Sequence, residues 1–116
     1  MTSNLIHHED LRMFTKQVMR KMGASDDDAF YVADSLVISN LRGIDSHGVG
    51  RLKRYVDGIR SGYIQPKSKP KTERNSPISA SINAMNGLGQ PVSVLGMVCI
   101  NPKYPLLCQI NILVII

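Results

Sequence analysis

Asn40-Leu41-Arg42-Gly43-Ile44-Asp45-Ser46-His47-Gly48-Val49-Gly50-Arg51-Leu52 is the segment from which most of the fold and function of this chain can be predicted. It places His47 at the expected start of a helix and Arg51 four residues later, so both side chains should point the same way. An imidazole exchanges protons near neutral pH, and a guanidinium holds a carboxylate through two parallel hydrogen bonds. Such a pair is what the oxidation of a 2-hydroxy acid, or the reduction of a 2-oxo acid, requires.

A plainer interpretation fits the same residues. Asp45-Ser46-His47-Gly48 is typical of a turn that caps a helix, and Arg51 and Arg54 are typical of a solvated helix face. Spacing alone favours this interpretation, because short motifs often match by chance. A Rossmann domain is not supported, since Gly87-Leu88-Gly89 lacks the third glycine of the dinucleotide-binding fingerprint.

Working outward, apolar residues recur at spacings of three and four in segments 8–22, 26–40 and 45–61, which predicts three helices. Gly23 and Gly62 are expected to stop the first and third helices, and Ser25 to cap the second. The residues expected to face the core are Leu11, Phe14, Val18 and Met22 in the first helix, Ala29, Ala33, Leu36, Val37 and Asn40 in the second, and Val49, Leu52, Val56 and Ile59 in the third.

Beyond the helices, residues 65–77 alternate proline with lysine and predict an extended connector with a short edge strand near Lys71–Arg74. A second strand is expected over 78–85 and a turn over 86–90, with Pro91 at the first position of a fourth helix. We therefore expect an α+β fold, with three to four helices and one or two short strands.

Composition narrows the class of protein. A length of 116 residues allows one domain or part of a larger one, and the net charge of +5 suits anionic ligands. Cys99 and Cys108 have no metal-ligand spacing, and the first residues lack the apolar core of a signal peptide. We expect a cytoplasmic protein without a metal site, a membrane span or a nucleic-acid partner.

The segment 41–52, with Tyr55 three residues further on, resembles the signature of the non-Rossmann malate/L-lactate dehydrogenase family. That family includes ureidoglycolate, sulfolactate and 2,3-diketogulonate dehydrogenases or reductases. The resemblance extends over about residues 5–97, and takes in the Met22-Gly23-Ala24 helix end, the Gly62-Tyr63-Ile64 exit and the turn at 86–90.

The resemblance implies an oxidoreductase of 2-hydroxy or 2-oxo acids that uses NAD or NADP and works as a homodimer. It implies a helical N-terminal region packed on a large mixed sheet. By motif position, Ser46 and His47 carry over as catalytic residues and Arg51 as a ligand of the substrate carboxylate. Arg54 and Tyr55 are further substrate-binding candidates, whereas most of the family's cofactor contacts do not match any part of this chain.

We expect three divisions: a helical region at 1–64 with the Ser-His-Gly motif, a connector with short strands and the start of a helix at 65–97, and an apolar tail at 98–116. The tail departs from the family pattern, and a frameshift, a retained intron or a misassembled gene explains this most simply. On that basis we expect a truncated chain that is inactive alone.

Two other functions stay open. The lysines of the connector, together with Lys53, Arg54 and Arg60, fit a small basic binding module, although aromatic residues that would stack on bases are missing there. A non-catalytic fragment that docks on a full-length relative is the other alternative.

Overall fold

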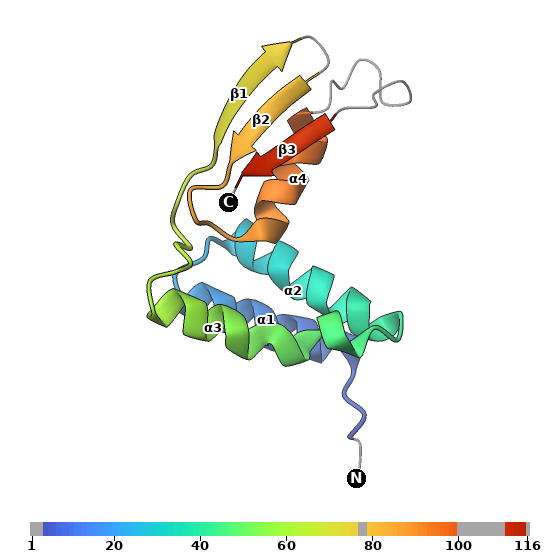
Figure 1. The fold of residues 1–116 in the computed structure, drawn as a ribbon. Helices are drawn as coiled ribbons and strands as arrows, with labels where there is room; N and C mark the ends of the chain where they lie inside the picture. Colours follow the sequence, from blue (N-terminus) through green and yellow to red (C-terminus); the bar gives the residue numbers. More distant parts are fainter. Residues whose placement is uncertain (1–3, 77–78, 100–110, 116) are drawn as a thin grey trace.

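The computed structural model describes residues 4–76, 79–99 and 111–115. Figure 1 shows a layer of three helices, with a small sheet and a fourth helix above it. The elements are α1 (His8–Lys21), α2 (Asp26–Leu41), α3 (Leu52–Arg60), β1 (Lys71–Ser76), β2 (Ser79–Asn83), α4 (Gly89–Cys99) and β3 (Asn111–Ile115). The expected α+β class is confirmed, and a third strand joins the one or two that were expected.

The core lies where α1 and α2 meet. Met19 of α1 and Ala29 and Val32 of α2 are fully buried, and Leu52 of α3 completes the same cluster. At about 25 cal/mol per Å² of apolar surface removed from water, this packing is the main force that holds the helices together.

The face that α1 buries differs from the expected one. Phe14 is 58% exposed, whereas Thr15 is fully buried in its place. A buried hydroxyl is tolerated here because Thr15 Oγ1 donates a hydrogen bond to the Leu11 carbonyl at 2.8 Å. Periodicity counts apolar residues only, so it missed a polar residue that is satisfied within its own helix.

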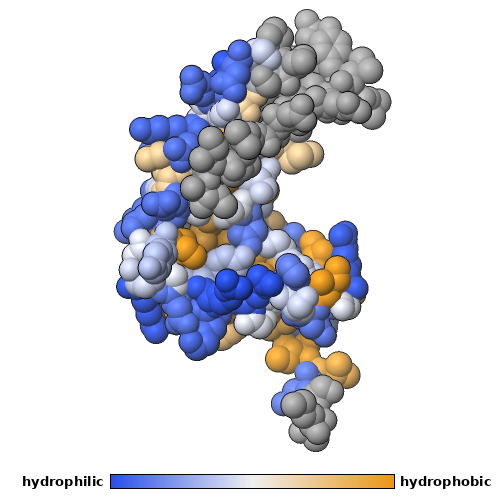
Figure 2. Space-filling model, viewed as in Figure 1, coloured by the Kyte–Doolittle hydropathy of each residue, from blue (hydrophilic) through white to orange (hydrophobic). Residues whose placement is uncertain are grey.

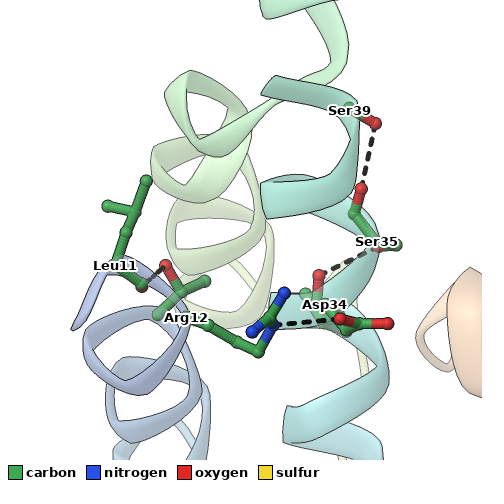
Figure 3. A network of polar contacts seen from close by, with 7 residues as sticks. Leu11, Arg12, Asp34, Ser35 and Ser39 are labelled. Carbon is green, nitrogen blue, oxygen red and sulfur yellow. Dashed lines mark hydrogen bonds and ion pairs between the residues drawn. The ribbon is translucent and has the colours of Figure 1, made fainter. Parts of the chain in front are cut away.

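Three ion pairs join α1 to α2 in the described part of the chain: Arg12–Asp34, Lys16–Asp26 and Arg20–Asp26. Arg12 Nε lies 3.0 Å from Asp34 Oδ1, in a geometry that misses hydrogen-bond alignment (Figure 3). Both side chains are partly exposed, so the pair contributes at most about 1 kcal/mol. The apolar contacts around Met19 therefore dominate.

The third expected helix begins later than predicted. Asp45–His47 and Val49–Arg51 form two short 3₁₀ turns, and the α-helix starts only at Leu52. Gly48 separates the turns because its backbone is extended, with φ −90° and ψ −158°. His47 and Arg51 therefore both lie in short turns before the α-helix, and the prediction that they lie one turn apart on a single helix is wrong.

The sheet has the order β1-β2-β3. β1 pairs antiparallel with β2, and β3 pairs in parallel with β2, with Ser79 opposite Asn111. β1 is an edge strand, as expected, and β3 is formed by part of the apolar tail. Ile82, Ala84 and Val92 form a second small core that joins β2 and the residues after it to α4.

No helix in the described part of the chain is long and apolar enough to cross a membrane.

The burial of Met19 and the exposure of Met13 on the same helix, α1, predict different effects of replacing each by alanine. Met19→Ala should lower the free energy of unfolding by about 2 to 5 kcal/mol, because it removes a fully buried side chain. Met13→Ala, at a position 61% exposed on α1, should leave it within about 0.5 kcal/mol of wild type. Urea unfolding followed by circular dichroism measures both. Equal losses would contradict the assignment of α1's buried face.

Candidate functional site

At the end of α2 the chain reverses direction, and the residues that follow carry Ser46, His47 and Arg51. The amide of Gly43 donates to the Asn40 carbonyl at 3.0 Å, and the amide of Ile44 donates to the Ser39 carbonyl at 2.8 Å. Gly43 has φ +76°, a conformation that residues with a Cβ seldom adopt. This hydrogen-bonded ending sends residues 44–51 back along the last turn of α2.

The side chain of Asn40 holds the returning segment. Its Oδ1 accepts the Val49 amide at 2.8 Å, and its Nδ2 donates to Asp45 Oδ1 at 2.7 Å. A Cβ on Gly48 would lie 2.3 Å from Asn40 Oδ1, so this contact requires glycine. Helical spacing predicts Asn40 in the buried stripe and does not reveal this role. The available signal was the position of Asn40 beside a turn with three glycines.

Ser46, His47 and Arg51 come together in this segment. Ser46 Oγ lies 2.9 Å from His47 Nδ1, and Arg51 Nε donates to the Ser46 carbonyl at 2.6 Å. Ser46 and His47 are exposed and Arg51 is half-buried. The three residues predicted from the motif therefore form one connected group, although the helix expected to carry them is interrupted.

Arg51 also lines a basic pocket, which we define by Arg51, Arg54, Tyr55, Gly58, Tyr63 and Ile64. The pocket has a volume of about 310 Å³, and its lining carries two guanidinium groups and no carboxylate. Figure 2 shows a mainly hydrophilic surface over α3. A Cβ on Gly58 would lie 2.7 Å from Ile64 Cδ1, so glycine lets the chain after α3 close over the helix. All three substrate-binding candidates thus line one pocket.

Tyr55 has a partner that the sequence analysis did not identify. Gln90 Nε2 of α4 donates to the Tyr55 hydroxyl at 2.6 Å, while Gln90 Oε1 is buried without a partner among the described residues. Both side chains also line a more open cavity of about 540 Å³ between α2 and α4. The hydroxyl of Tyr55 therefore ties α3 to α4, and its ring packs against the main core.

The arrangement suits a small organic anion. Two guanidinium groups in one pocket attract a carboxylate. Ser46 and His47 do not line this pocket, and the link between them and the pocket is the bond from Arg51 Nε to the Ser46 carbonyl. A volume of about 310 Å³ lies at the lower end of the range for ligand pockets. The size of the basic pocket and its two positive charges suit a small acid.

Comparison with known proteins defines the class: the chain resembles dehydrogenases of hydroxy acids. The family model described as malate/L-lactate dehydrogenase matches residues 6–103. The chain belongs to this family, which confirms the resemblance given by the motif around His47.

Individual relatives agree with the family match. The malate dehydrogenase of Pyrococcus abyssi is 45% identical over 92 residues, which cover 79% of this chain and 25% of the relative. The ureidoglycolate dehydrogenase (NAD(+)) of Escherichia coli O157:H7 is 32% identical over 92 residues, which cover 79% of this chain and 26% of the relative. The solved structure of malate dehydrogenase from Pyrococcus horikoshii OT3 matches with a TM-score of 0.80 at 42% identity, over 85% of this chain and 28% of that one. The chain thus spans about a quarter of the length of the curated relatives.

The Tyr55–Gln90 contact generates a stability prediction. Tyr55→Phe should lower the free energy of unfolding by about 1 to 2 kcal/mol, because the amide of Gln90 loses its partner in a partly buried site. Tyr63→Phe is the control, since Tyr63 also lines the basic pocket but is 83% exposed. Urea unfolding measures both variants. A Tyr55→Phe variant as stable as Tyr63→Phe would mean that the hydroxyl does not tie α3 to α4.

Proposed function

We propose that this chain carries the acid-binding part of the active site of an NAD(P)-dependent oxidoreductase that interconverts 2-hydroxy and 2-oxo acids. The observation that carries this proposal is the convergence of Arg51, Arg54 and Tyr55 on one basic pocket, together with the bond by which Arg51 Nε joins this pocket to the Ser46–His47 pair. Membership of the malate/L-lactate dehydrogenase family supports it.

In this proposal Arg51 binds the substrate carboxylate. Its Nε is already bonded to the Ser46 carbonyl at 2.6 Å, which orients the guanidinium and leaves its two terminal nitrogens for a carboxylate. Arg54 follows on the first turn of α3 and lines the same pocket, so it adds a second positive charge. A dicarboxylate such as malate would engage both arginines.

His47 is proposed as the residue that takes the hydroxyl proton in oxidation and returns it in reduction. When His47 Nδ1–H donates to Ser46 Oγ, which lies 2.9 Å away, His47 Nε2 keeps a free lone pair and acts as a base. We therefore assign Ser46 the role of favouring the His47 tautomer that carries its proton on Nδ1. Tyr55, whose hydroxyl is bonded to Gln90, contributes the wall of the pocket.

NAD or NADP is proposed as the hydride acceptor in oxidation, by resemblance to the family. Most of the family's cofactor contacts match no part of this chain, so we assign the cofactor site to other parts of the family fold. A homodimer for a full-length relative and a cytoplasmic location remain predictions.

The acid-binding role predicts a charge-specific interaction with L-malate. Arg51→Ala and Arg54→Ala should each weaken malate binding about tenfold, because each removes charge-assisted hydrogen bonds. Titration followed by amide chemical shifts measures this, with the uncharged dimethyl ester of malate as the ligand control.

Arg60→Ala is the matched protein control for this titration. Arg60 lies in the last turn of α3, is exposed, and does not line the basic pocket, yet its removal changes the net charge equally. It should leave malate affinity nearly unchanged. Equal weakening by Arg60→Ala and Arg51→Ala would reduce the interaction to general charge attraction and refute the proposed site.

The same proposal predicts no turnover by this chain alone. The purified protein with NADH or NADPH and a 2-oxo acid should consume no cofactor above the protein-free rate, because it spans only about a quarter of its relatives' length. The loss of reduced-cofactor absorbance measures this. Turnover by the 116-residue chain would overturn the assignment of the cofactor site to other parts of the fold.

A further inference from the structure

We propose that Asn40 is a positioning residue of this site, whose side-chain amide sets the orientation of His47 by clamping the segment 45–49 against the end of α2. The inference rests on the proposed function, because it gives His47 and Ser46 their roles. Asn40 itself does not line the basic pocket, so it acts through the segment and not on the substrate.

The clamp consists of two hydrogen bonds from the Asn40 side chain, one on each side of the Ser46–His47 pair. The Asn40 amide donates to Asp45 Oδ1 at 2.7 Å before the pair and accepts from the Val49 amide at 2.8 Å after it. A primary amide has both a donor and an acceptor, so one side chain holds both ends of the turn.

Little else in the described structure holds this segment. Neither 3₁₀ turn contains a buried residue, and Ser46 and His47 are exposed. Val49 packs, half-buried, against the main core, and the backbone of Gly48 between the two turns is buried. The other hydrogen bonds of the segment lie within it or come from Arg51. With so little apolar burial, the orientation of His47 depends on polar contacts, and the two bonds from Asn40 are the ones that tie it to α2.

Gly48 supplies an independent test of the clamp. Its backbone angles, φ −90° and ψ −158°, are accessible to alanine, but a Cβ would lie 2.3 Å from Asn40 Oδ1. The cost of Gly48→Ala should therefore depend on Asn40. Gly50→Ala is the matched control in the next turn, because a Cβ there meets nothing within 4 Å.

Exchanging the amide and the carboxylate between positions 40 and 45 distinguishes loss of the clamp from a general loss of stability. Asn40→Asp keeps an acceptor for the Val49 amide but sets two carboxylates against each other. The double variant Asn40→Asp/Asp45→Asn restores a donor opposite an acceptor and keeps the wild-type net charge. The second substitution should therefore rescue the first.

The experiment measures the ligand-free chain by NMR. Two readouts report on the segment: hydrogen exchange of the Val49 amide, and the nitrogen chemical shifts of the His47 ring, which give its tautomer ratio. Asn40→Ala and Asn40→Asp should change the tautomer ratio, and Asn40→Ala should speed Val49 exchange about tenfold through loss of its hydrogen bond. The exchanged double variant should return both readouts to wild-type values. Urea unfolding gives global stability in parallel.

The glycine series completes the test. Gly48→Ala should speed Val49 exchange in the wild-type background but add little in the Asn40→Ala background, and Gly50→Ala should change neither readout. Unchanged His47 shifts in Asn40→Ala, additive effects of Gly48→Ala and Asn40→Ala, or no rescue by the exchanged pair would each overturn the proposal. Because these readouts need no ligand, a failed malate titration would count against the proposed function and leave the positioning role standing.

Discussion

Helix α2 packs directly against α1 and α4, and it shares the main core with Leu52 of α3 (Figure 1). Ala29, Val32 and Leu36 lie in the main core, and a chain with 5% aromatic residues has few other large side chains to bury. The free energy of that burial sets where α2 ends relative to its neighbours. The position of the returning segment follows from that end.

The site is built on a helix terminus and a turn instead of a continuous helix. The amides of Gly43 and Ile44 donate to the Asn40 and Ser39 carbonyls, which ends the helix and reverses the chain. The side-chain amide of Asn40 then holds the reversed segment. Hydrogen bonds are directional, so they orient Ser46 and His47 more narrowly than apolar packing of an exposed turn could. Arg51 lies at the junction, bonded to the Ser46 carbonyl and open to the basic pocket.

Much of this could be predicted from local rules. The helix stops at Gly23 and Gly62, the cap at Ser25 and the edge strand at β1 all follow from conformational preferences of single residues, and all are confirmed. The interruption at Gly48 was missed because hydrophobic periodicity runs through it without a break. The parallel pairing of β3 with β2 was missed because the conformational preferences of single residues do not indicate which distant strand a strand pairs with.

Hydrophobic periodicity and one long motif were enough to predict the α+β class, the helices and the family. The sequence also singled out Ser46, His47 and Arg51 as a group. Only the tertiary structure decided that Arg51, Arg54 and Tyr55 line one pocket, that Gln90 binds the Tyr55 hydroxyl, and that Asn40 holds the turn. Those contacts join residues from different elements, and their geometry exists only once the helices have buried their apolar faces against one another.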